Sequence, residues 1–211
     1  SGSIDTAVVV DLHTALTEAG FALNETLWDF YAGQAADYTR TTSDVAEVPL
    51  SKYTDAVKTS YADYADAAVV VISRTGGEGD DLHPEVSYLD LQPDEREMLA
   101  HVKENFSKIV VLLNSSNPLC LGWLEEYGVN ACLWIGGPGQ TGLTAVAEML
   151  VGDRVPSGKL ADTYAASADS APAAQNFGEF CYINAVGQPA EMDTQYFDLT
   201  NSTGAVSTIP N

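Results

Sequence analysis

Three short apolar runs divide the middle of the chain, at residues 67–72, 109–113 and 131–135. Each run is nearly continuous and does not alternate between apolar and polar positions, which is typical of strands buried on both faces of a parallel sheet. Helical patterns lie between and after the runs. Strands that alternate with helices imply right-handed crossovers, so the pattern predicts an α/β fold with an open, mostly parallel sheet and helices on both faces.

The predicted helices follow from apolar spacing and from residues that start or stop helices. One begins at Pro93, a good first-turn residue, and a short one covers residues 121–126. Another ends at Gly152, which serves as a stop signal. The apolar positions that define the first and last of these helices are Met98, Leu99, Val102 and Phe106, and then Leu143, Val146, Ala147 and Leu150.

The two ends of the chain differ from this regular pattern. Apolar positions from Val8 to Ala19 predict a helix that ends at Gly20, so the domain opens on a helix and we expect its first strand to be missing. Residues 22–60 carry many aromatic residues and predict an excursion packed beside the sheet. Residues 165–211 have no sustained period and predict a connecting or wrapping tail, which leaves residues 1–164 as the α/β sandwich domain.

Composition and charge exclude several classes of partner. The 211 residues include 30 acidic and nine basic side chains, for a net charge of -21. Nucleic acid and anionic membranes need clustered Lys and Arg, so neither is an expected partner. The three cysteines lack metal-ligand spacing and predict no zinc site, with Cys120 and Cys132 as buried thiols. Free thiols favour a reducing cytoplasm, although a secreted protein is not excluded if the chain is a fragment.

Three loops follow the predicted strands, at residues 73–81, 114–118 and 136–142. In open parallel sheets, ligands bind beyond the carboxyl ends of the strands, so this edge is the predicted site. Trp134 lies just before the third loop, where core packing is the default expectation, although an aromatic residue there could stack on a sugar.

The first loop places Glu78 between two glycines, which leave its carboxyl group unshielded. Like-charge repulsion from Asp80, Asp81 and Glu85 would raise the pKa of Glu78, whereas Arg74 would lower it. A carboxyl group with a raised pKa can act as a general acid near neutral pH. The alternatives are a solvated acidic turn and a calcium site formed by the same four carboxylates, whose spacing does not match an EF-hand.

The third loop contains a G-x-G-x-x-G sequence between a strand and a helix, at residues 137–142, with Asp162 about 20 residues further on. This spacing is that of a dinucleotide-binding fingerprint. Pro138 stiffens the turn, and the fingerprint usually follows the first strand of its domain. Two interpretations remain: a nucleotide-binding α/β domain, and a tight turn that needs glycine for helix–sheet packing.

The motifs in chain order resemble the α/β sandwich domain of glycoside hydrolase family three, which includes the β-glucosidases. The resemblance covers residues 62–164 and rests on AVVVISRTGGEGDD, then KIVVLLNSSNPLCLGWL, then ACLWIGGPGQTGLTAVAEMLVGDRVPSGKLADTY. It implies a retaining, exo-acting enzyme in which a separate (β/α)8 barrel supplies an Asp nucleophile and this domain supplies the acid/base. Carried onto this chain, the acid/base is Glu78, with Arg74 and Asp81 as substrate-binding or supporting residues.

The resemblance also implies partners and departures. The substrate would be a β-linked oligosaccharide or glucoside, no metal or cofactor is expected, and the oligomeric state stays open. A barrel needs roughly 200 residues or more, so it does not fit in this chain beside the sandwich, and the chain alone is expected to be inactive. The pattern of residues 156–164, followed by residues 173–180, resembles the branch in which the sandwich precedes the barrel. Thr141 stands where the family commonly has an acidic residue. A non-catalytic interaction domain with the same fold is the remaining alternative.

Overall fold

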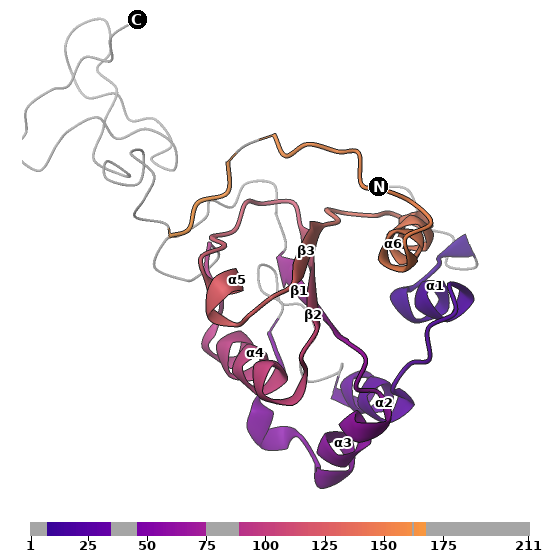
Figure 1. Cartoon of the computed structure of the whole chain (residues 1–211), viewed down its shortest axis with the longest axis vertical. Coiled ribbons are helices and arrows are strands. Elements are labelled where there is room, and N and C mark those ends of the chain that lie inside the picture. The colour runs from indigo at the N-terminus through magenta and orange to yellow at the C-terminus, as the bar shows by residue number, and fades with distance from the viewer. Residues whose placement is uncertain (1–7, 35–45, 75–88, 162, 168–211) are drawn as a thin grey trace, which may run out of the picture.

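A three-stranded parallel sheet forms the centre of the computed structural model, which describes residues 8–34, 46–74, 89–161 and 163–167 (Figure 1). The strands are β1 (Ala68–Arg74), β2 (Ile109–Ser115) and β3 (Ala131–Trp134), in the order β1-β2-β3. Both pairs are parallel, with Val70 opposite Val111 and Leu112 opposite Leu133. The predicted α/β fold with parallel strands at the three apolar runs is therefore confirmed.

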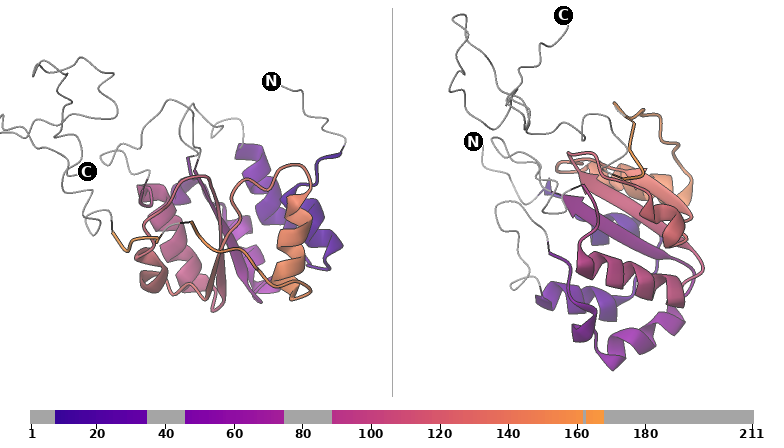
Figure 2. Two further views of the ribbon diagram at one scale, coloured as in Figure 1. Left: turned by 90° about the horizontal axis from the view of Figure 1, so that it is seen from above. Right: turned by 90° about the vertical axis from the view of Figure 1, so that its left-hand side faces the viewer.

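Helices cover both faces of the sheet. Helices α4 (Pro93–Asn105) and α5 (Trp123–Glu126) lie on one face, and α1 (Leu12–Glu18) and α6 (Gly142–Val151) lie on the other (Figure 2, left). Helix α6 ends at Val151, and the next residue, Gly152, has a left-handed φ of 88°, as its stop signal predicts. Helix α5 is shorter than the predicted segment and begins at Trp123.

The main core lies between the sheet and the layer of α4 and α5. Its members are alternate residues of β1 and β2 together with the apolar stripe of α4, and they include Val70, Ile72, Met98, Leu99, Val111 and Leu113. Trp123 is buried in this core and donates its indole N–H to the carbonyl of Cys120 at 2.6 Å. A smaller cluster joins α1 to α6 on the opposite face and includes Ala15, Leu16 and Ala147.

Helix α1 begins later than its apolar pattern predicts. The expected helix included Val8, but the observed helix starts at Leu12 because Asp11 caps it: a carboxylate oxygen of Asp11 accepts the N–H of Thr14 at 2.7 Å. That hydrogen bond lowers the pKa of Asp11. Val8 and Val9 are exposed, and the backbone N–H of Val10 instead donates to the carbonyl of Gln140 at 2.8 Å.

The aromatic segment forms a second, smaller unit of packing beside the sheet, as predicted. It comprises α2 (Glu25–Gln34), the 3-10 turn η2 (Leu50–Lys52), α3 (Asp55–Ser60) and the 3-10 turn η3 (Tyr61–Asp63). Its cluster is formed by Val48, Tyr53, Val57 and Tyr61, with Leu27, Phe30, Tyr31, Leu50 and Phe106 packed against them. Phe106 joins this unit to the end of α4.

A carboxylate is held inside this aromatic unit. Glu47 accepts hydrogen bonds from the hydroxyl of Tyr31 at 2.7 Å and from the N–H of Val48 at 2.8 Å, and Tyr31 also contacts the hydroxyl of Tyr53. Desolvation by burial raises the pKa of Glu47 above its ordinary value of 4.5, and the hydrogen bonds offset only part of that effect.

Glu47→Gln is expected to increase the free energy of unfolding relative to the parent, and to do so more at neutral pH than at acid pH. Because the pKa of Glu47 is raised in the folded state, its contribution to stability is fully present below the unfolded pKa and is lost as pH rises through the folded pKa. Glutamine keeps the acceptor oxygen but cannot ionise. Urea unfolding should therefore show the variant gaining on the parent between about pH 4 and pH 7, by about 1.4 kcal/mol per unit of pKa difference.

The exposed Glu104→Gln is the matched control and should change stability by less than about 0.5 kcal/mol at either pH. A stability difference between Glu47→Gln and the parent that stays constant with pH would contradict the placement of Glu47.

The outer strand β3 is more open than its apolar sequence predicts. Cys120 is buried as expected, but Cys132 on β3 is exposed, and Trp134 at the end of the strand is 45% exposed. The predicted burial of Cys132 and the default core placement of Trp134 are therefore wrong. The physical reason is that β3 pairs on one side only, with β2, within the part of the chain that the structure describes.

Among the described helices, none has the length and apolar character that a membrane-spanning segment needs.

Candidate functional site at the carboxyl edge of the sheet

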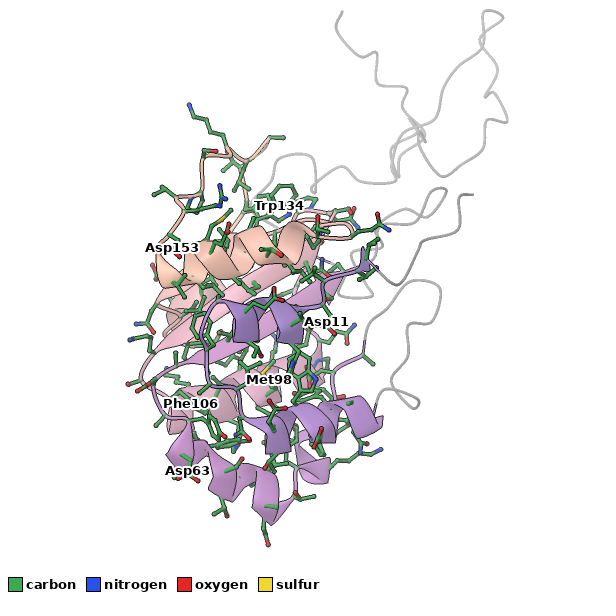
Figure 3. The ribbon with its side chains drawn as sticks, turned by 90° about the vertical axis from the view of Figure 1, so that its right-hand side faces the viewer. Asp11, Asp63, Met98, Phe106, Trp134 and Asp153 are labelled. Atoms are coloured by element: carbon green, nitrogen blue, oxygen red, sulfur yellow. The ribbon has the colours of Figure 1, made fainter. Side chains whose placement is uncertain are left out.

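The described parts of the three predicted loops meet at the carboxyl edge of the sheet. The amide of Asn114, at the end of β2, donates to the carbonyl of Gly136 at 2.6 Å and accepts a 3.4 Å hydrogen bond from the hydroxyl of Ser73. Figure 3 shows Trp134 and Asp11 toward this end of the sheet and Phe106 toward the opposite end. The prediction that the three loops line one edge is confirmed for these residues.

Arg74, the last residue of β1, is buried at this edge and forms an ion pair. Its guanidinium donates to both carboxylate oxygens of Glu95 on α4, at 2.6 and 2.7 Å. The side chains of Arg74 and Glu95 are only 1% and 4% exposed. A two-pronged arginine–carboxylate pair of this kind fixes both position and orientation, so Arg74 is held rigidly and its charge is balanced by Glu95.

The same guanidinium also holds the chain that enters α4. It donates to the carbonyl of Asp90 at 2.8 Å and to the carbonyl of Ser73 at 2.8 Å. Glu95 in turn accepts the N–H of Gln92 at 2.8 Å, which satisfies one of the free donors at the start of the helix. Arg74 Nε has no hydrogen-bond partner within the described residues.

Trp134, the last residue of β3, lies at the same edge and contacts the end of β2. Its indole N–H donates to the carbonyl of Ser115 at 2.8 Å, and Ser115 is itself buried, with its hydroxyl bonded to the carbonyl of Asn117 at 2.8 Å. Gly136 has a φ of 56°, and a Cβ there would lie 3.0 Å from the Trp134 ring. A glycine at this position therefore lets the backbone turn beneath the indole.

Glu78 and Asp81, the predicted acid/base and one of its supporting residues, lie outside the described residues, as do the four carboxylates of the calcium alternative. Of the predicted site residues, the structure describes Arg74. Within the described ranges, no group of three or more His, Cys, Asp or Glu side chains could hold a metal ion.

The loop at 137–142 joins β3 to α6 as a tight turn. Gly139 adopts a φ of 68°, and a Cβ on Gly142 would lie 3.1 Å from Pro138. The left-handed backbone at Gly139 favours glycine, and a side chain at Gly142 would press against Pro138 at the start of α6. Thr141, in the N-cap position of α6, makes no side-chain capping hydrogen bond. Asp162, which the nucleotide interpretation requires, is not among the described residues.

The sequence does not single out Glu95 or the exposed placement of Trp134. Glu95 lies in the first turn of a helix that begins at Pro93, where a glutamate commonly serves as a cap. That capping signal was available from the sequence. The second partner of Glu95 was not, because Arg74 lies 21 residues away and the two meet only through the β1–α4 crossover.

The fold and this edge define a class of protein: a parallel α/β domain whose three crossover loops converge where such sheets bind ligands. A family model described as the glycosyl hydrolase family 3 C-terminal domain matches residues 1–199. The chain therefore belongs to glycosyl hydrolase family 3, and the resemblance in its sequence motifs is confirmed.

Curated relatives include β-glucosidases from bacteria. The chain is 32% identical over 184 residues to a β-glucosidase of Ruminococcus albus, which covers 83% of this chain and 19% of that protein. It is 26% identical over 208 residues to β-glucosidase A of Butyrivibrio fibrisolvens, covering 85% of this chain and 25% of that protein. The chain thus spans no more than a quarter of the length of these relatives.

Solved structures give the same result. A β-glucosidase from Paenibacillus barengoltzii superposes with a TM-score of 0.71 at 27% identity, covering 86% of this chain and 22% of that one. β-Glucosidase 3B from Thermotoga neapolitana, solved in complex with α-D-glucose, superposes with a TM-score of 0.67 at 26% identity, covering 81% of this chain and 25% of that one.

Proposed function

We propose that this chain is the sandwich domain of a retaining, exo-acting β-glucosidase-like hydrolase and that it supplies Glu78 as the general acid/base. The family and its β-glucosidase relatives support the hydrolase part of the proposal. The role of Glu78 is supported by its place in the sequence, four residues after Arg74, the last residue of β1 at the carboxyl edge. That edge carries the proposal, because ligand sites of parallel sheets form there.

The proposed reaction needs two carboxyl groups. A retaining glycosidase holds an acid/base and a nucleophile about 5 to 5.5 Å apart, one protonating the leaving oxygen and the other attacking C1 of the sugar. In this proposal, Glu78 protonates the oxygen that leaves and then deprotonates the water that hydrolyses the glycosyl-enzyme. The nucleophile is an Asp of a (β/α)8 barrel elsewhere in the same enzyme, and the substrate is a β-linked glucoside.

Activity is expected to require both domains. A polypeptide that joins this chain to its barrel should hydrolyse an aryl β-glucoside, whereas the 211-residue chain alone should show no turnover above the uncatalysed rate, because it lacks the nucleophile. Release of the aryl alcohol, followed by absorbance, measures both. Hydrolysis by the isolated chain would contradict the division of roles, and an inactive two-domain polypeptide would contradict the proposed activity.

A further inference from the structure

The buried side chain of Arg74 links the two ends of the segment 75–88, because it pairs with Glu95 and contacts Asp90 beyond that segment. Residues 75–88 follow directly after Arg74, and Asp90 comes shortly after their end. Arg74 donates to the backbone carbonyl of Asp90 at 2.8 Å, so one guanidinium contacts the chain on both sides of this segment. The ends of the segment that contains Glu78 are thus joined by a contact that does not depend on any residue within it.

The geometry of this contact is more constrained than an ordinary surface ion pair. Both side chains are nearly fully buried, and four of the five guanidinium N–H groups have acceptors on three different elements: β1, the turn before α4, and α4 itself. Lysine has a single ammonium on a flexible stem and cannot reproduce such a fork. Stability alone does not explain why an arginine and a glutamate are buried here, because a buried ion pair adds little net stability over apolar residues of similar shape.

We infer that Arg74 and Glu95 are positioning residues for the acid/base, holding the two ends of the segment that carries Glu78 at a fixed separation at the carboxyl edge of the sheet. This inference rests on the proposed function of Glu78. Both side chains are nearly fully buried, so in this inference neither contacts the substrate. Each acts on Glu78 through the backbone that joins them. The expected effect is large because displacing a reacting group by about 1 Å can lower the rate on the order of a hundredfold.

The test uses the two-domain enzyme with Arg74→Lys and Glu95→Gln. Each is assayed on a β-linked glucose disaccharide, whose leaving group needs protonation, and on 2,4-dinitrophenyl β-glucoside, whose leaving group does not. A positioning role predicts that kcat/KM falls by about tenfold or more on the disaccharide and by less than about threefold on the activated glucoside. Two variants are made so that if one fails to fold, judged by far-UV circular dichroism, the other decides.

Leu99→Ala is the matched control. Leu99 lies on the same helix as Glu95 and is fully buried, but it belongs to the apolar core. Its truncation should lower the melting temperature while leaving the ratio of the two kcat/KM values unchanged. The inference is overturned if the folded Arg74→Lys and Glu95→Gln enzymes keep the parent's ratio, or if they lose activity equally on both substrates.

Failure of this inference can be told apart from failure of the proposed function. If Glu78→Gln shows the leaving-group dependence and the ion-pair variants do not, Glu78 remains the acid/base and the pair is only structural. If Glu78→Gln shows no such dependence, the proposed role of Glu78 fails, and the positioning role of Arg74 and Glu95 is overturned with it.

Discussion

Glu78→Gln is expected to lower kcat/KM on a β-linked disaccharide by about 10²- to 10⁴-fold, the range that general acid catalysis contributes. Glutamine has nearly the shape of glutamate but cannot give a proton to the leaving oxygen. On 2,4-dinitrophenyl β-glucoside the loss in kcat/KM should be far smaller, because that leaving group departs as an anion. Initial rates on the two substrates, measured in the two-domain enzyme, provide the comparison.

Two further readouts separate loss of the acid from general damage. A general acid must be protonated, so kcat/KM of the parent on the disaccharide should fall as pH rises through the pKa of that acid, and the variant should lack this fall. Azide should also speed turnover of the activated glucoside by the variant. Azide is an anion and needs no general base to activate it. It attacks C1 of the glycosyl-enzyme to give a glucosyl azide, and the carboxylate of the nucleophile leaves.

Glu85→Gln is the control for charge, because it removes one carboxylate from the same acidic stretch without removing the proposed acid. We expect it to change kcat/KM by less than about tenfold on both substrates, since it removes a charge near Glu78 in the sequence and leaves the proposed acid in place. Full activity of Glu78→Gln on the disaccharide would rule out the assignment.

The strands and the long helices could be predicted because each is marked by the order of apolar residues within its own segment. The continuous apolar runs become β1, β2 and β3, and the stripe that begins at Pro93 becomes α4. The start of α1 is an instructive error: helical spacing of apolar residues places Val8 in the helix, but the capping carboxylate of Asp11 sets where the helix begins. Apolar spacing alone does not weigh a cap against the residues before it.

The candidate site was predicted as an edge of the sheet, not as a set of contacts. Chain order and parallel pairing suffice to bring the ends of the three strands together. They do not show that Arg74 is paired with Glu95, because that contact depends on how α4 is rotated over β1. Nor do they show that Trp134 is exposed, because a strand's place at the edge or centre of the sheet is a property of topology and not of its own residues.

The same dependence on topology gives the second large expected effect, on stability. Leu112→Ala is expected to destabilise the 211-residue chain by about 2 to 5 kcal/mol, the range for truncating a buried leucine. Leu112 is 0% exposed on the central strand β2, on the sheet face opposite α4. Its truncation leaves a cavity between β2 and the elements over that face, in addition to the lost burial of its methyl groups.

Val71 offers a matched comparison on the same face. It lies directly opposite Leu112 in the β1–β2 register, but β1 is an outer strand of the described sheet and Val71 is 37% exposed. More than a third of Val71 already contacts water in the folded state, so Val71→Ala should cost less than about 1 kcal/mol, even allowing for the lower strand preference of alanine. Urea unfolding monitored by circular dichroism measures both changes. Equal losses for the two variants would contradict the outer position of β1, because the side chains are neighbours that differ chiefly in how far their strands are enclosed.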